Sequence, residues 1–285
     1  MSTLTGAAEM VAHHLVPTPV GSLAVQVDGE GPPTVLWPSL FVDERSWQRV
    51  AAGLAVDHRL VLITGPGHGE STDPGRLYTN GECADAAVTV LDALGITDPV
   101  DWLGNAWGGH VGALFAARWP ARCRSLVTMG TPLQALDTWE RARTLFLLLA
   151  YRVFGPAAFI QAAVTKTLLS AQTRASDRGA VDLVRSCLAN ADRAELRNAV
   201  ISVSLRREDL SSLLPDIAVP TLFITGRGHS GWTPQQAQAA SELLPDGSWA
   251  VVSDAAYLVP LEAPEETVRL IRQFWATNLP AHKGA

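Results

Sequence analysis

The chain has 285 residues, of which 47% are hydrophobic and 18% are charged, and its formal net charge is −6. This length suffices for one full-sized domain with an insertion. Because the balance is mildly acidic and no run of Lys or Arg could follow a phosphate backbone, the composition excludes nucleic acid as an expected partner.

Cysteine usage and hydropathy indicate the compartment. The three cysteines, Cys83, Cys123 and Cys187, are odd in number and widely spaced, which is typical of thiols in a reducing compartment and offers no metal spacing. No signal peptide pattern opens the chain, and the most apolar stretch, 145–150, is far too short to span a bilayer. We therefore expect a cytoplasmic protein with no metal, no cofactor and no membrane partner, and its oligomeric state stays open between monomer and dimer.

The first part of the chain predicts a hairpin followed by alternating strands and helices. Segments 13–16 and 22–27 flank a Pro- and Gly-containing turn, which is the signal of a β-hairpin. Apolar runs typical of strands covered on both faces lie at 34–37, 60–63, 100–103 and 125–129. The segment 80–94, between the second and third of these runs, has helical spacing.

The alternation stops after residue 131 and resumes near residue 216. The block 132–215 is almost entirely helical in pattern, and strands at 221–224 and 249–252 then alternate with helices at 234–244 and 263–277. Such alternation predicts a mostly parallel sheet with helices on both faces. The helical block is too long for a connection, so we expect a lid, with 1–131 and 216–285 forming the two parts of an α/β core.

The most informative segment is 104–108, which reads Gly-Asn-Ala-Trp-Gly between a predicted strand and a predicted helix. This is the context of a nucleophile elbow, Gly-x-Ser-x-Gly, in which glycines are needed because strand and helix pass close together. The central residue of such an elbow carries a nucleophile. Here it is Ala106, whose methyl group can attack nothing.

Taken together, the hairpin, the parallel sheet, the elbow and the helical insertion resemble the α/β-hydrolase fold. The resemblance covers nearly the whole chain outside the lid. Segment 65–71, Gly-Pro-Gly-His-Gly-Glu-Ser, resembles the family's Gly-x-Gly-His-Gly-x-Ser loop. Segments 219–226 and 258–264 are similar to the strand that leads to the catalytic acid and to the segment just after the catalytic histidine.

The resemblance implies positions for a catalytic triad, and all three depart from the family pattern. The nucleophile position is Ala106, the acid position is His229, and the histidine position is Tyr257. Hydrolysis through an acyl-enzyme needs an activated nucleophile, a base and an orienting group, so these residues exclude that mechanism. Three coordinated changes favour a naturally remodelled site over an engineered knock-out, although whether Ala106 is native stays open.

The rest of the expected site also follows from the resemblance. Pro-Ser stands at 38–39 where the family usually has His-Gly, and the backbone N–H groups of Leu40 and Trp107 remain as expected oxyanion-type donors. A lid over a sheet makes an apolar cavity, so we expect a hydrophobic small-molecule ligand. The residues expected to line this pocket are Ser39, Phe41, Thr131, Trp139, Tyr151 and Trp232.

Three functions are compatible with these residues. The first hypothesis is a cofactor-independent cyclase, lyase or isomerase in which His229 and Tyr257 face each other and move protons, with natural-product biosynthesis as its setting. The first alternative is a non-catalytic small-molecule binding protein on the same fold. The second is an ester or lactone hydrolase with an engineered dead site. The substrate, the reaction and any contact between His229 and Tyr257 stay open.

Overall fold

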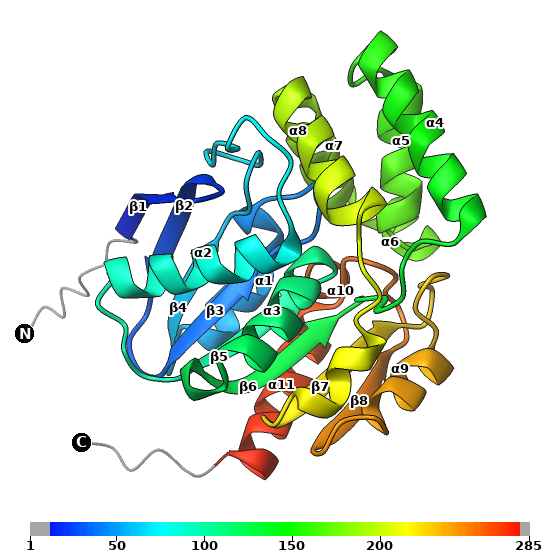
Figure 1. The fold of residues 1–285 in the computed structure, drawn as a ribbon. Helices are drawn as coiled ribbons and strands as arrows, with labels where there is room; N and C mark the ends of the chain where they lie inside the picture. The colour runs from blue at the N-terminus through cyan, green and yellow to red at the C-terminus, as the bar shows by residue number, and fades with distance from the viewer. Residues whose placement is uncertain (1–11, 280–285) are drawn as a thin grey trace, which may run out of the picture.

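A computed structural model describes residues 12–279 of the chain. The described residues form an eight-stranded sheet in the order β1-β2-β4-β3-β5-β6-β7-β8 (Figure 1). Strands β1 and β2 form the predicted antiparallel hairpin, β2 is antiparallel to β4, and all other neighbours are parallel. The strands are β1 (Ala12–Thr18), β2 (Gly21–Asp28), β3 (Pro33–Trp37), β4 (Arg59–Ile63), β5 (Val100–Asn105), β6 (Cys123–Met129), β7 (Thr221–Gly226) and β8 (Gly247–Val252).

Helices cover both faces of the sheet, as the sequence predicted. On one face lie α2 (Asn80–Ala93), α3 (Trp107–Arg118) and α9 (Pro234–Ser241), and on the other lie α1 (Gln48–Leu54), α10 (Val259–Glu262) and α11 (Pro264–Asn278) (Figure 1). Short 3₁₀ turns, η1 (Glu44–Trp47) and η2 (Pro120–Arg122), precede α1 and β6.

Each sheet face has its own hydrophobic core because side chains alternate along a strand. In β5, Trp102 packs with the α2–α3 side, whereas the next residue, Leu103, packs with the α1–α11 side. Both are fully buried, and so are their counterparts in β3, β4, β6 and β7. A sheet buried on both faces explains the continuous apolar runs of the sequence.

A helical insertion stands between β6 and β7, beyond the ends of the parallel strands (Figure 1). It has its own core, in which Ile160, Val184 and Leu188 pack together, and Leu258 and Leu261 of the sheet domain join that core. Its elements are α4 (Thr138–Phe154), α5 (Ala158–Leu168), α6 (Ala171–Ser176), α7 (Arg178–Asn190), α8 (Arg193–Ala199), a π-helical turn η3 (Val200–Leu205) and a 3₁₀ segment η4 (Ser211–Asp216).

The insertion is tied to the sheet domain close to α10. The Glu262 carboxylate accepts hydrogen bonds from the Ser170 N–H at 2.7 Å and from the Thr173 hydroxyl at 2.8 Å. The Leu258 N–H donates to the Leu168 carbonyl at 3.3 Å. The segment that follows Tyr257 is therefore fixed against the insertion.

The described residues also bear on membrane, metal and redox expectations. No helix between residues 12 and 279 combines the length and the apolar character needed to cross a membrane. Within the same part of the chain, no three His, Cys, Asp or Glu side chains are grouped so that they could hold a metal ion. Cys83, Cys123 and Cys187 are free thiols.

Candidate active site

The predicted elbow is a strained turn between β5 and α3. Ala106 has φ 48° and ψ −101°, and Phe41 is the other described non-glycine residue with a positive φ. A Cβ at Gly104 would collide with the Gly108 carbonyl, and one at Gly108 would collide with the Trp37 carbonyl. The glycines are required by close backbone approach, so the frame of a nucleophile elbow is intact around an alanine.

The backbone N–H groups around this turn fall into two kinds, those that are hydrogen-bonded and those that are not. The Gly108 N–H donates to the Pro38 carbonyl at 3.2 Å, which holds the loop after β3 against the elbow, and the Phe41 N–H donates to His68 Nε2 at 3.2 Å. Among residues 12–279, the N–H groups of Leu40 and Trp107 make no hydrogen bond. Trp107 opens α3, where the helix dipole favours a negative or partly negative oxygen. The donor role assigned to both groups stays a prediction.

Asn105 connects the elbow to the segment that carries Tyr257. Its side-chain amide donates to the Met129 carbonyl at 2.8 Å and to the Tyr257 carbonyl at 2.9 Å. Sequence reasoning missed this residue, although its place directly before the elbow centre is a usable signal. The amide fixes the Tyr257 backbone relative to Ala106.

His229 and Tyr257 are in contact, but through their ring faces. The ring centroids are 4.1 Å apart with an interplanar angle of 27°. His229 Nδ1 accepts a hydrogen bond from the Gly231 N–H at 3.0 Å, so the neutral ring carries its proton on Nε2. That Nε2 is buried and has no partner among the described residues. The contact is a stacked pair, without the hydrogen bond that an acid–base couple needs.

Burial keeps both rings uncharged. Desolvation lowers the pKa of His229 to about 4, so the imidazole is neutral at pH 7. Desolvation likewise raises the pKa of the Tyr257 phenol, against the opposing effect of the Arg207 guanidinium. With Nδ1 occupied and Nε2 protonated, His229 is a hydrogen-bond donor and has no free lone pair to act as a base.

A buried positive charge lies beside this pair. Arg207 follows the π-helical turn of the insertion, donates from Nη2 to the Gln134 carbonyl, and leaves its buried Nε without a partner among the described residues. His110 lies in the first turn of α3. Burial and the Arg207 charge lower the pKa of its imidazole to about 3. Sequence reasoning missed Arg207, because no pattern in the helical block marks it.

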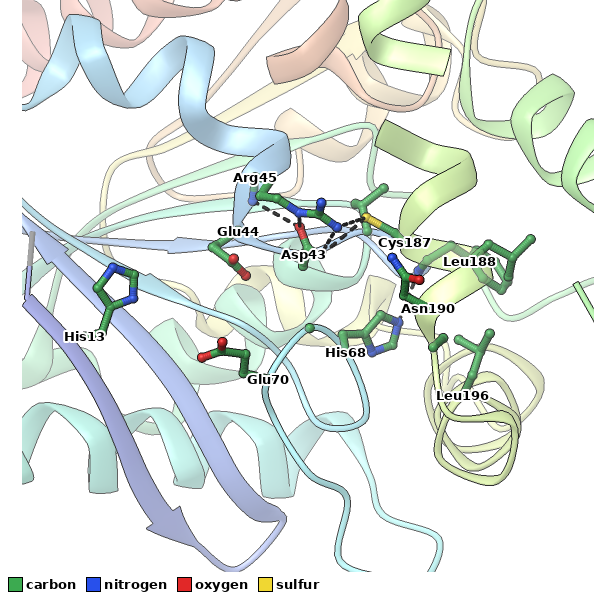
Figure 2. A pocket seen from close by; sticks show the side chains of 14 residues that line it. His13, Asp43, Glu44, Arg45, His68, Glu70, Cys187, Leu188, Asn190 and Leu196 are labelled. Carbon is green, nitrogen blue, oxygen red and sulfur yellow. Dashed lines mark hydrogen bonds and ion pairs between the residues drawn. The ribbon is translucent and has the colours of Figure 1, made fainter. Parts of the chain in front are cut away.

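A cavity of about 370 Å³ opens beside the loop after β3 (Figure 2). Phe41 and His68 line it on the sheet side, and Cys187 and Leu188 of α7 line it on the insertion side. Its floor is polar because Arg45 Nη2 lies 2.8 Å from the Asp43 carboxylate, which also accepts from Cys187 Sγ at 3.4 Å.

The charges in this cavity are fixed by their contacts. Burial opposes ionisation of Asp43, but the hydrogen bonds and the charge of Arg45 lower the pKa of that carboxyl overall. Burial raises the pKa of Cys187 to about 12, so the group is a neutral thiol. The cavity is therefore a mixed surface in which one ion pair is already satisfied.

The residues expected to line the pocket lie in different environments. Phe41 borders the cavity, and Ser39 and Thr131 are buried in the turns next to the elbow. Tyr151 packs in the core of the insertion, Trp232 is fully buried against Phe223, and Trp139 is 77% exposed. The lining role of these six residues stays a prediction, and the structure does not gather them around one cavity.

Residues 37–264 match the family model of the α/β-hydrolase fold, and the chain belongs to this family. It is 25% identical over 267 residues to a 2-hydroxy-6-oxo-2,4-heptadienoate hydrolase of Pseudomonas putida, covering 90% of each chain. It is 24% identical over 259 residues to a pimeloyl-[acyl-carrier protein] methyl ester esterase of Aeromonas hydrophila, covering 89% of this chain and 99% of that protein.

Solved structures share the fold at lower identity. An enol-lactonase from Burkholderia xenovorans superposes with a TM-score of 0.84 at 22% identity, over 93% of this chain and all of that chain (100%). A thermophilic esterase from Thermogutta terrifontis gives 0.85 at 23% identity, over 95% and 100%. At this identity the likeness shows the fold alone.

These relatives correct the first functional hypothesis. They are named as hydrolases and an esterase, so the expectation of a non-hydrolytic cyclase, lyase or isomerase in biosynthesis is wrong. The geometry gives a physical reason for the error. That hypothesis needed His229 to take up a proton, whereas the Gly231 N–H occupies its Nδ1 and burial disfavours its charged form.

Proposed function

We propose that this protein is a binding member of the α/β-hydrolase family. It holds a small carbonyl compound of the kind that its relatives hydrolyse, such as an ester, a lactone or an unsaturated oxo acid, and forms no acyl-enzyme. The observation that carries the proposal is Ala106, which keeps the strained elbow with φ 48° while offering no nucleophile.

Backbone strain supports a retained use of the elbow. A non-glycine residue in such a conformation costs on the order of 1–3 kcal/mol, and such strain clusters at functional sites. What the turn still presents is the Trp107 N–H at the start of a 12-residue helix, and in this proposal the Leu40 N–H is the second donor. Two N–H groups at a helix N-terminus suit a carbonyl oxygen.

The triad positions support binding without covalent chemistry. In this proposal Ala106, His229 and Tyr257 take the nucleophile, acid and histidine positions of the family. No member of that set can attack or deprotonate, because His229 is neutral with its proton on Nε2 and burial keeps the Tyr257 phenol protonated. The Arg207 charge beside Tyr257 adds a positive potential that favours a ligand with a carboxylate or an electron-rich oxygen.

Hydrolysis by direct attack of water is the second candidate. The names of the relatives favour it, and so do the two backbone donors, which would polarise a carbonyl for a water molecule as they would for a serine. The mechanism lacks a side-chain base at the elbow, so its rate would rest on the donors alone.

The experiment that separates the candidates is incubation of the purified protein with a methyl ester, an enol-lactone and a dienoic oxo acid. Native mass spectrometry records the bound species, and chromatography records product. Retention of an intact compound in a 1:1 complex supports the binding proposal, and catalytic turnover to acid and alcohol supports the second candidate. If no compound of the three classes is bound or turned over, both candidates are wrong.

A matched pair of variants locates the ligand. Ala106→Asp places a carboxylate in front of the backbone donors and should abolish binding, whereas Ala106→Gly relieves the strain, leaves the donors in place and should bind as the parent does. Equal loss in both variants would show that the ligand does not lie at the elbow.

We keep the cytoplasm as the proposed location, which the three free thiols support.

A further inference from the structure

The outer side of helix α4 carries large apolar side chains that nothing covers. Trp139 is 77% exposed, Phe146 69%, Leu149 60% and Val153 62%. Their spacing of seven, three and four residues puts them on one face of the helix, and we name these four residues the α4 stripe. Phe154 and Phe159, whose rings are 5.7 Å apart in an edge contact, extend the exposed surface toward α5.

This surface differs from the other exposed hydrophobic residues of the described chain. Leu15, Trp119 and Trp249 come from separate elements on the sheet domain, where isolated apolar exposure is ordinary. Helix α4 is apolar on its inner side too, where Tyr151 is buried in the core of the insertion. A helix that is apolar on both sides is expected to be covered on both.

The charges of α4 identify what covers the outer side. The helix holds three arginines, Arg141, Arg143 and Arg152, against one acid, Glu140, in a chain whose net charge is −6. At 100° per residue, Arg141 and Arg152 border the α4 stripe on one side and Arg143 borders it on the other. All three are exposed, and neither Arg143 nor Arg152 forms an ion pair with a described acidic group.

A second copy of the chain fits this charge pattern poorly. An antiparallel two-fold pairing of α4 helices would bring Arg141 of one copy against Arg152 of the other, along the edge of the contact. Like charges facing each other across an interface are destabilising. An anionic surface, in contrast, pairs with cations on both borders of the stripe.

We propose that the α4 stripe docks the protein onto an anionic lipid surface. The helix lies in the plane of the headgroups, with Trp139 and Phe146 at the boundary of the acyl chains and with Arg143 and Arg152 at the phosphates. Arg141 donates to the Leu205 carbonyl and adds its charge from that position. The contact is peripheral, in keeping with the absence of a membrane-crossing helix from residues 12–279. It departs from the sequence expectation that the protein has no membrane partner, and it does not depend on the ligand proposed for the elbow.

Sedimentation with vesicles tests the proposal on the full chain. We expect the protein to sediment with vesicles of phosphatidylcholine and phosphatidylglycerol, more weakly at high salt, and not with phosphatidylcholine alone. The double variant Trp139→Ser/Phe146→Ser should reduce the partition coefficient by roughly tenfold or more, because it removes the deepest apolar contacts. The matched control Trp119→Ser/Trp249→Ser changes two exposed tryptophans of the sheet domain and should bind as the parent does.

Three results would overturn the proposal. The first is a parent protein that does not bind the anionic vesicles, and the second is equal binding by both double variants. The third is a parent dimer, seen by light scattering, that Trp139→Ser/Phe146→Ser dissociates with no change in vesicle binding. All substituted residues are exposed, and circular dichroism of each variant establishes that the fold is kept. Arg143→Glu/Arg152→Glu should weaken binding to the anionic vesicles chiefly at low salt, and an unchanged salt dependence contradicts the charge argument.

Discussion

The two ends of the candidate site differ in what they keep. At the elbow, every backbone feature of a nucleophile turn is present, from the positive φ of Ala106 to the glycines on either side. At the other end, where we propose that the family's acid and histidine positions lie, the rings of His229 and Tyr257 are stacked. The elbow thus has its backbone geometry with an alanine at the centre, while the second end is a packed pair of rings with no hydrogen bond between them.

The difference separates what a backbone donor needs from what a side-chain base needs. Backbone donors act on a ligand oxygen by position alone, so they need the strained turn but no reactive side chain. A base needs a free lone pair and access to a proton, and the His229 environment provides neither. The proposed binding of a carbonyl group without turnover needs only the first of these two kinds of interaction.

The largest effect is expected when a nucleophile is placed at the elbow and an acid and a histidine are placed at the second end. The triple variant Ala106→Ser/His229→Asp/Tyr257→His should hydrolyse an activated ester about 10³-fold faster than Ala106→Ser alone, because a serine without its base retains only weak catalysis. The stacked contact at 4.1 Å puts the two exchanged positions within reach of each other. Stopped-flow release of nitrophenolate measures the rates, and equal rates in two well-folded variants would contradict the assignment of the triad positions.

The next largest effect sharpens the comparison at the elbow. Gly108→Ala should lower the free energy of unfolding by roughly 3 kcal/mol or more, because the added Cβ collides with backbone that cannot move cheaply. Gly179→Ala in helix α7 is the matched control, since its Cβ meets only ordinary contacts with the Asp177 and Arg49 side chains and alanine favours a helix. Urea titration of both proteins measures the difference, and a similar stability in both would show that the elbow is not close-packed.

The same two ends explain how much of the molecule the sequence could predict. The elbow could be predicted because the local backbone conformation requires its glycines, and five consecutive residues show the pattern. The sheet could be predicted because each buried strand is a continuous apolar run. The tautomer of His229 could not, since it is set by the N–H of Gly231 and by burial, and sequence does not show either one.

Parts of the site that come from the insertion were also beyond prediction. The cavity joins Asp43 to Cys187, which are 144 residues apart in the chain, and no spacing rule relates them. Trp139, which was expected in the pocket, is 77% exposed, because α4 has two apolar sides and its pattern does not tell which of them turns inward. Arg207 follows a π-helical turn that leaves no signature in the composition.

The third prediction is a pH dependence of stability from the second end. His229 has a pKa of about 4 in the folded chain against an ordinary value of 6.5, so the unfolded state binds more protons between these values. Stability should therefore fall as the pH falls from about 6.5 to about 4, by about 3 kcal/mol for this group, and change little above pH 7. His110, with a pKa of about 3 in the folded chain against the same ordinary value of 6.5, adds to the slope over this whole range and extends it below pH 4.

Urea titrations at several pH values check this slope. His229→Asn keeps an acceptor for the Gly231 N–H and removes the titrating ring, so it should make the dependence between pH 6.5 and pH 4 clearly shallower, while the contribution of His110 remains. The exposed His14→Asn serves as the control and should leave it unchanged. The same slope in His229→Asn and in the parent would mean that the imidazole is not held neutral by burial.

The smallest effect concerns Ala106 alone, and it separates strain from chemistry. Glycine adopts a positive φ without the Cβ penalty, so Ala106→Gly should stabilise the protein, by about 1 kcal/mol after the larger chain entropy of unfolded glycine is subtracted. Thermal unfolding measures the gain. A loss of stability would mean that the Ala106 methyl makes packing contacts worth more than the strain. If instead the variant gains stability and still binds the ligand, the turn itself is what the site requires, and the side chain at its centre is dispensable.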